Sequence, residues 1–303
     1  MNWRSHSRRS SRPCTIVSPS RASHLNDRVT QVFLHPTFMA PSIAPLESDD
    51  LHFYDIQYLP DGYHPIIVGD ILGPSSERQY RIMHKLGWGG YSTVWLAQKT
   101  DSSKAFVAVK VTTADDGIDP TREASMLAKA QTKDGAHVLT LLDSFTLRGP
   151  NGTHAVLVTD IVVPMALLLF HDRTLRPLWR NNAAHGLGRA LVSLHATGIV
   201  HGGTLSLSFV KDTAHPPLYL HTGNFGFSFP QIADQDPHSL MQDLDQHDMI
   251  IVLPISAAHQ TPSLPAYVLL PCNLAKYYGE IAGNDLPQMK ILDFGSGKPH
   301  FSG

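Results

Sequence analysis

Short runs of alternating apolar and polar residues begin at Tyr80 and are separated by turn residues, a pattern typical of β-strands. Five such runs occupy residues 80–86, 92–98, 105–111, 138–145 and 154–161. An Asn-Gly pair at 151–152 lies between the last two runs and is typical of a tight hairpin. The pattern therefore predicts an antiparallel sheet of five strands.

Two later stretches have the spacing of amphipathic helices. The first presents one apolar face: Met126, Leu127 and Ala130. Asp119 or Thr121 could cap its start, and Pro120 suits a first helical turn. The second helix has a leucine face: Leu187, Leu191 and Leu194. Gly198 follows where a helix commonly ends in the left-handed conformation, so we expect the helix to stop there.

The remaining chain is irregular at both ends of this region. Residues 1–50 are rich in serine and arginine with few acids, and they contain too little apolar surface to offset chain entropy. We expect a disordered basic leader there. Residues 230–288 contain seven prolines, which favours a stretch that is mostly loop or spacer. Residues 289–292 then predict one last short strand.

Composition excludes several classes of protein. An apolar content of 42% is ordinary for a globular domain, and a net charge of −2 gives no general attraction to nucleic acid or membrane. The two cysteines, Cys14 and Cys272, support neither a disulfide framework nor a four-ligand zinc site. No apolar run approaches the ~20 residues needed to cross a bilayer.

One predicted turn contains residues that could take part in binding or catalysis. Glycine at 87 and 89, between the first two strands, lets the backbone turn tightly and approach phosphate oxygens without an intervening Cβ. The third strand then ends in Val107-Ala108-Val109-Lys110. Glu123 follows on the first helix, and Asp293-Phe294-Gly295 follows the last strand. This combination is typical of the ATP-clamping half of a protein kinase.

The chain thus resembles a protein kinase, and more narrowly the SR-protein kinase family. Residues 86–97 are similar to the G-W-G-x-[FY]-S-T-V-W-L loop of that family, and residues 141–154 are similar to its strand pair before the hinge. The spacer before Asp293 is a third similarity. The resemblance covers about residues 54–297. It implies an α+β, protein-kinase-like fold with a five-stranded antiparallel small lobe, one helix, and an incomplete, mostly helical large lobe.

The resemblance also assigns roles to individual residues. Lys110 would hold the α- and β-phosphates of ATP, oriented by an ion pair with Glu123. Asp293 would bind Mg²⁺, because a hard cation prefers anionic oxygen. The other residues expected at the nucleotide are Leu86, Gly87, Gly89, Val94, Ala108, Asp160 and Ile161, the last two in the hinge.

The catalytic loop departs from the family pattern, which requires an aspartate base and an asparagine five residues later. Glycine at position 203, two residues after His201, stands where the aspartate should be. An ungapped alignment puts Ser208 at the asparagine position. A second alignment treats residues 203–219 as an insertion and keeps Asn224 as a metal ligand. Neither alignment supplies the base, so His201 and Gly203 mark a degenerate loop and we assign no catalytic residue.

The expected organisation has four parts. They are a leader at 1–50, an extension at 51–78, a small lobe at 79–162, and a partial large lobe at 163–303 with an insertion at 203–219 and a spacer at 225–288. The activation segment and A-P-E motif of a kinase do not follow Gly295 in this sequence. We therefore expect a truncated large lobe and impaired catalysis.

The most specific functional hypothesis is an ATP- and Mg²⁺-binding serine/threonine kinase-like domain with weak phosphoryl transfer. The resemblance implies serine in Arg-Ser dipeptides as the acceptor and Arg/Ser-rich proteins as partners. Two alternatives stay open: a pseudokinase fragment that binds nucleotide or a partner without turnover, and a degenerate or mis-spliced product. The family suggests cytoplasm and nucleus, while the basic leader leaves mitochondrial import open.

Overall fold

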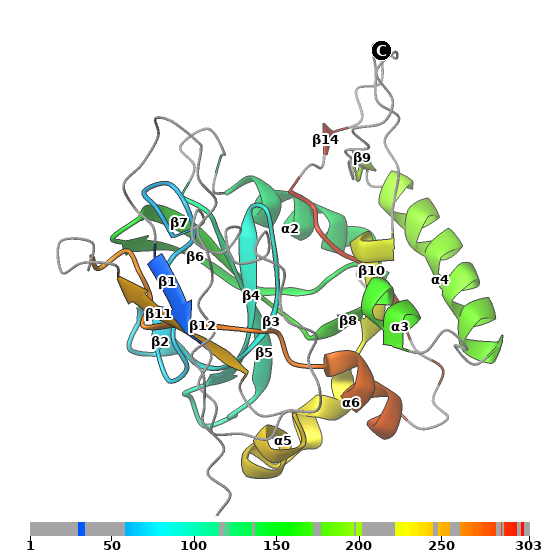
Figure 1. Cartoon of the computed structure of the whole chain (residues 1–303). Coiled ribbons are helices and arrows are strands. Elements are labelled where there is room, and N and C mark those ends of the chain that lie inside the picture. Colours follow the sequence, from blue (N-terminus) through cyan, green and yellow to red (C-terminus); the bar gives the residue numbers. More distant parts are fainter. Residues whose placement is uncertain are drawn as a thin grey trace, which may run out of the picture.

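The computed structural model describes residues 30–33, 58–114, 119, 121–134, 137–171, 177–196, 198–201, 222–244, 248–254, 261–282, 286, 288–295 and 298–299. Its largest element is a six-stranded sheet in the order β2-β3-β4-β5-β7-β6, in which every pairing is antiparallel (Figure 1). The strands are β2 Ile71–Ser75, β3 Arg78–Gly89, β4 Ser92–Lys99, β5 Phe106–Thr112, β6 Leu141–Gly149 and β7 Gly152–Thr159. The antiparallel sheet predicted from the sequence is present.

The predicted count of five strands is not confirmed, because β2 adds a sixth at the edge beside β3. Its pattern is too weak to be read from the sequence, since Leu72 is the single buried position among its five residues. The strand β6 also begins at Leu141 rather than Val138, which instead makes an isolated bridge to Ile291. The presence of β2 and the start of β6 therefore both depend on pairing with strands elsewhere in the chain, which a local sequence pattern does not show.

The helix α2 spans Arg122–Asp134 and follows the sequence prediction closely. Its predicted apolar face is buried: Met126, Leu127 and Ala130. The Asp119 carboxylate accepts a hydrogen bond from the Thr121 amide at 2.9 Å, and the Thr121 carbonyl accepts one from the Ser125 amide, also at 2.9 Å. The first bond pairs an amide that a helix start would otherwise leave unpaired, and the second is the first hydrogen bond of the helix itself.

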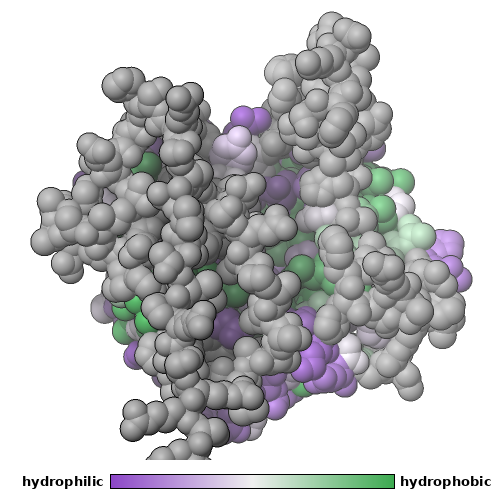
Figure 2. Space-filling view, in the orientation of Figure 1, coloured by the Kyte–Doolittle hydropathy of each residue, from purple (hydrophilic) through white to green (hydrophobic). Residues whose placement is uncertain are grey.

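The helix α4 spans Pro177–Ala196, and Gly198 after it has a φ of +70°, the left-handed conformation expected of a helix-terminating glycine. Of its leucine face, Leu194 is fully buried, while Leu187 and Leu191 are partly exposed. Figure 2 shows hydrophobic residues reaching the surface in the region of α4, where Val192 is 73% exposed. No helix in the described part of the chain is long and apolar enough to cross a membrane.

Three short sheets complete the described strands. They comprise β13 Met289–Ile291, β10 Phe225–Ser228 and β8 Val162–Pro164; β14 Lys298–Pro299 with β9 Ile199–Val200; and β1 Thr30–Phe33, β11 Met249–Pro254 and β12 Tyr267–Leu269. The first of them continues directly from β7 and carries the strand that precedes Asp293. It therefore joins the six-stranded sheet to the expected metal-binding residue.

The prediction of a mostly irregular stretch at 230–288 is wrong for the residues described there. That stretch contains the 3₁₀ helix η3 Pro230–Asp234, the helices α5 Pro237–Asp243 and α6 Leu274–Ile281, and the strands β11 and β12. Pro230 and Pro237 stand at the starts of helices, where a missing N–H costs nothing. The side chains of Asp236 and Asn273 cap α5 and α6. Two of the seven prolines thus mark helix starts, whereas Pro262, Pro265 and Pro271 do lie in turns or irregular segments.

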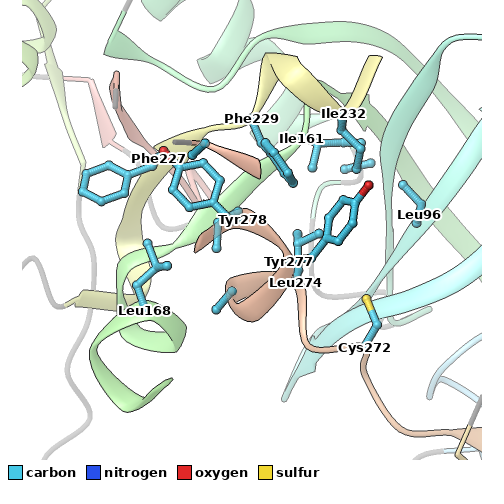
Figure 3. Close-up of a cluster of buried hydrophobic side chains, with 14 of the residues drawn as sticks. Leu96, Ile161, Leu168, Phe227, Phe229, Ile232, Cys272, Leu274, Tyr277 and Tyr278 are labelled. Atoms are coloured by element: carbon cyan, nitrogen blue, oxygen red, sulfur yellow. The ribbon is translucent and has the colours of Figure 1, made fainter. Parts of the chain in front are cut away.

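The core of the second half lies between α6, α3 (Met165–His171), α4 and the underside of the six-stranded sheet. Stacked and edge-on aromatic pairs link its centre, with Tyr278 contacting Trp179, Phe227 and Phe229 (Figure 3). The predicted insertion at 203–219, with Gly203, lies outside the described residues. So does the leader except for β1, and nothing in the structure tests the predicted domain boundaries.

Candidate nucleotide site

Lys110 is the centre of the most highly charged cluster in the described structure. Its Nζ lies 2.8 Å from both carboxylate oxygens of Glu123 and 3.1 Å from Oδ1 of Asp293. Three segments, β5, α2 and the residues after β13, therefore meet at one ammonium group. Burial by itself lowers the pKa of Lys110, but the charges of Glu123 and Asp293 outweigh it and raise that pKa above its ordinary value.

The alternation of β5 explains why Lys110 points toward α2. Val107, Val109 and Val111 pack in the cluster on the outer face of the sheet, whereas Ala108 packs in the cluster on the inner face. Because successive side chains of a strand point to opposite faces, Lys110 shares the inner face with Ala108. Glu123 sits in the first turn of α2, where the helix dipole favours a carboxylate.

Asp293 directly follows Leu292 and has a φ of +59°, a left-handed conformation that aspartate tolerates better than most residues. The Lys110 charge lowers the pKa of Asp293 below its ordinary value, so its carboxylate is ionised at neutral pH. Behind it, the His201 Nε2 lies 2.6 Å from the Leu292 carbonyl oxygen, and the His201 ring contacts Phe294 edge-on. His201 therefore supports the backbone on which Asp293 stands.

Asn224, the other expected metal ligand, lies beside Asp293 because its carbonyl oxygen accepts a hydrogen bond from the Leu292 amide at 2.7 Å. Asp293 offers an anionic oxygen and Asn224 is an oxygen-bearing neighbour, which suits Mg²⁺. Within the described residues no three His, Cys, Asp or Glu side chains form a metal-binding group. That donor set fits a cation held by one carboxylate with help from substrate phosphates, the usual arrangement for Mg²⁺.

The glycine-rich hairpin joins β3 to β4, with Gly89 paired to Ser92. A Cβ added at Gly87, Gly89 or Gly90 would meet no atom within 4 Å, and neither Gly87 nor Gly89 has a positive φ. Neither packing nor backbone conformation therefore requires glycine at 87 and 89. Free space beside an accessible backbone is what an approaching phosphate group would need, so these residues fit a nucleotide.

The expected adenine-facing residues belong to one apolar cluster: Leu86, Val94, Ala108 and Ile161. Ala108 and Ile161 are buried, while Leu86 and Val94 are partly exposed. The Ile161 carbonyl oxygen already accepts a hydrogen bond from the Phe229 amide at 3.0 Å. The structure thus brings the four side chains together, and their contact with a base stays a prediction.

Asp160 lies between β7 and β8, as expected for the hinge, but its carboxylate faces protein. It accepts hydrogen bonds from the Thr140 amide at 2.8 Å and from Lys290 Nζ at 2.6 Å. Lys290 also donates to Thr140 Oγ1 at 2.7 Å. The sequence analysis missed Lys290, although a lysine between Met289 and Ile291 in an apolar strand is a signal of a buried ionic partner. This cluster fixes the hinge to the strand that precedes Asp293.

The extension before the sheet contributes a second feature that sequence reasoning missed. The buried Tyr63 hydroxyl donates a hydrogen bond to the Gly89 carbonyl oxygen, and the Asn151 side chain donates to the Tyr63 carbonyl oxygen at 2.6 Å. The extension therefore holds the glycine-rich hairpin from its outer face. A single tyrosine in an irregular stretch gives no sequence pattern from which this contact could be found.

No protein-family profile matches the chain. Three curated relatives are similar to part of it: serine/threonine-protein kinase spk-1 of Caenorhabditis elegans, 37% identical over 39% of this chain and 12% of its own length; serine/threonine-protein kinase SKY1 of Saccharomyces cerevisiae, 36% identical over 35% and 15%; and SRSF protein kinase 3 of Homo sapiens, 31% identical over 39% and 21%. The chain spans less than a quarter of the length of these relatives.

These relatives, together with the antiparallel sheet and the Lys110–Glu123 pair, define a protein-kinase-like chain. Within that class, the resemblance to the SR-protein kinases is confirmed: over somewhat more than a third of its length, the chain is similar to kinases of that family.

Proposed function

We propose that this chain binds ATP with Mg²⁺ between the glycine-rich hairpin and the cluster of Lys110, Glu123 and Asp293. The observation that supports it most directly is the ammonium group of Lys110, held by Glu123 and Asp293 under an open glycine-rich hairpin. Lys110 would meet phosphate oxygens, and Asp293, with Asn224 beside it, would hold the Mg²⁺ that neutralises their charge. The metal supplies electrostatic stabilisation of the phosphates when it is bound.

We further propose that phosphoryl transfer by this chain is weak. The acceptor class proposed for it is serine next to arginine, which is the activity implied by the resemblance to SR-protein kinases. Gly203 stands in the sequence position of the expected base, and no other residue is assigned to that role. Because phosphoryl transfer depends mainly on positioning and electrostatics, slow transfer without the base is compatible with the charges around Lys110.

Ligand-induced stabilisation of the full chain tests the binding proposal. MgATP at about 100 times its dissociation constant should raise the free energy of unfolding by ~2.7 kcal/mol. Lys110→Ala should abolish this increase, and Lys104→Ala is the matched control because Lys104 is exposed in the turn between β4 and β5. A cooperative unfolding transition that MgATP does not shift would contradict the proposal.

Transfer is measured separately with radiolabelled ATP and an Arg-Ser repeat peptide. We expect a rate near background that depends on Lys110. Efficient turnover that Lys110→Ala removes would contradict the proposal of weak catalysis while supporting the nucleotide site.

A further inference from the structure

Residues 267–278, here called the strap, pass from one face of the six-stranded sheet to the other. Leu269 is buried in the outer-face cluster with Ile82 and Val109. Leu274, five residues later, is buried in the inner-face cluster with Leu96 and Ala108. Five residues can span at most about 18 Å, so the strap takes a short path round an edge of the sheet.

The strap meets the sheet at the strand that leads into the glycine-rich hairpin. The Cys272 amide donates a hydrogen bond to the Lys85 carbonyl oxygen at 2.9 Å. The register between β2 and β3 runs only as far as Arg81, so the described part of β3 beyond Ile82 has a strand partner, β4, on one side alone. The strap therefore adds a hydrogen bond to the edge of β3 that faces away from β4, immediately before Leu86 and Gly87.

Beyond that edge, the strap contributes to the buried apolar cluster that also contains the side chains expected to meet adenine. Leu274 and Tyr277 belong to the same cluster as Leu86, Val94 and Ala108. Figure 3 shows Leu274, Tyr277 and Cys272 on one segment, in the same view as Ile161 and Leu96 of this cluster. The strap thus belongs to the cluster in which Leu96 is completely buried, while Leu86 and Val94, nearest the glycine-rich hairpin, keep part of their surface exposed.

Both ends of the strap are anchored, so its position is fixed. The Val68 amide donates to the Tyr267 hydroxyl oxygen at 3.0 Å, and Val268 packs with Tyr58 and Tyr63. At the other end, the Tyr278 ring contacts the rings of Trp179, Phe227 and Phe229, which lie outside the strap. A segment that is already held in place does not have to lose conformational entropy when a ligand binds beside it.

We propose that the strap forms the outer wall of the adenine-binding half of the nucleotide site, with Leu274 as its main apolar contact. The inference rests on the proposed function and extends it, because it assigns part of the site to a stretch that the sequence indicated was only a spacer. An adenine ring entering beside Val94 and Ala108 would lie between the sheet and the strap.

Calorimetric binding of MgATP and of magnesium tripolyphosphate to the full chain tests the wall. Leu274→Ala should weaken ATP binding on the order of ten-fold, the usual effect of removing apolar contact in a pocket, and leave tripolyphosphate binding unchanged. Leu240→Ala is the matched control: Leu240 is buried in the same cluster but lies on α5. It should change ATP affinity less than two-fold.

Three results for Leu274→Ala would overturn the inference. They are tighter ATP binding, which would mean that the strap fills the site, unchanged ATP binding, and an equal loss of affinity for ATP and tripolyphosphate. Labelling of Cys272 in a Cys14→Ser background gives a second measurement in which the strap is unaltered. Cys272 is buried and forms no disulfide among the described residues, and MgATP should slow the reaction of its thiol several-fold while tripolyphosphate should not. Acceleration by MgATP, or no effect, would again exclude the wall.

The two proposals fail in different ways. If the unaltered chain binds no ATP, the proposed function is wrong, and the inference that the strap forms a wall of the site is wrong as well. If it binds ATP but neither Leu274→Ala nor Cys272 labelling responds, the proposed function stands and the wall alone is wrong.

Discussion

The two faces of the six-stranded sheet each hold a lysine, and the pKa values of these two lysines are shifted in opposite directions. On the inner face, Lys110 is paired with Glu123 and Asp293, and its pKa is raised. On the outer face, Lys85 is almost completely buried with its ammonium over the rings of Trp88 and Trp95, and burial lowers its pKa to about 8. Neighbouring charge, rather than depth alone, therefore sets the protonation of a buried lysine. The paired lysine is also the one expected at the nucleotide.

Removing the lysine of the inner face should have the largest effect. Lys110→Met leaves the Glu123 carboxylate, whose side chain is only 10% exposed, without its partner. Breaking a buried pair in this way costs about 3–5 kcal/mol of stability. Chemical denaturation should show the loss, and the double variant Lys110→Met with Glu123→Met should recover much of it. If the single variant is as stable as the unaltered chain, the pair contributes nothing to the fold.

Burying the charged ammonium group of Lys85 on the outer face should destabilise the fold, and this effect should appear as a dependence of stability on pH. Below pH 8 Lys85 is protonated in both states, so the folded state bears the full cost of burying the charge. Between pH 8 and about 10.5 the unfolded chain keeps the proton that the folded chain has released, so the free energy of unfolding rises with pH. We expect a rise of up to about 3 kcal/mol relative to Lys85→Met. Parallel pH profiles for the two proteins would contradict the lowered pKa.

A histidine pair on the outer face should act at lower pH. Burial, and then the nearby His154, lower the pKa of His64 to about 4, and the two rings meet edge-on with centroids 5.0 Å apart. Because the unfolded chain binds the proton first, stability should fall as the pH drops from 6.5 to 4, by about 2 kcal/mol once the shift is discounted for solvent screening of the partly exposed ring. His64→Phe should lessen the fall seen in thermal unfolding. An identical acid profile for that variant would refute this assignment.

The smallest expected effect concerns the link between the outer face and the glycine-rich hairpin. Tyr63→Phe removes the hydroxyl that donates to the Gly89 carbonyl oxygen but keeps the buried ring. A typical hydrogen bond contributes about 1 kcal/mol, so stability should fall by that amount. Amide exchange at the hairpin should also become faster, whereas exchange at β6 should not change. A uniform change in both places would indicate a global effect instead.

The sequence predicted those parts of the fold in which local pattern and tertiary packing agree. The alternation in β3, β4, β5 and β7 and the apolar face of α2 led to strands and a helix that the structure contains. The Lys110–Glu123 pair is also present, because strand alternation and a helix start place both groups. Their function at a nucleotide remains a prediction.

The rest depended on partners far away in the chain. The strap was hidden among prolines because its burial comes from strands about 180 residues earlier, as the Cys272–Lys85 hydrogen bond shows. The strand β2 has one buried residue, and its pairing with β3 is what defines it. Asp160 was expected in the hinge, where backbone groups meet adenine, and that role stays a prediction; the contacts of its carboxylate with Thr140 and Lys290 were not foreseen. No local pattern reports such long-range contacts.

The bond between Lys290 and Asp160 closes a loop of 130 residues. The entropic cost of such a closure grows only with the logarithm of loop length, so adding about 17 residues to it costs about 0.1 kcal/mol. Changes of length between the hinge and Asp293, such as the insertion predicted at residues 203–219, should therefore cost little free energy. The same bond that positions Asp293 lets the intervening chain gain or lose sequence while the ends of the loop stay where they are.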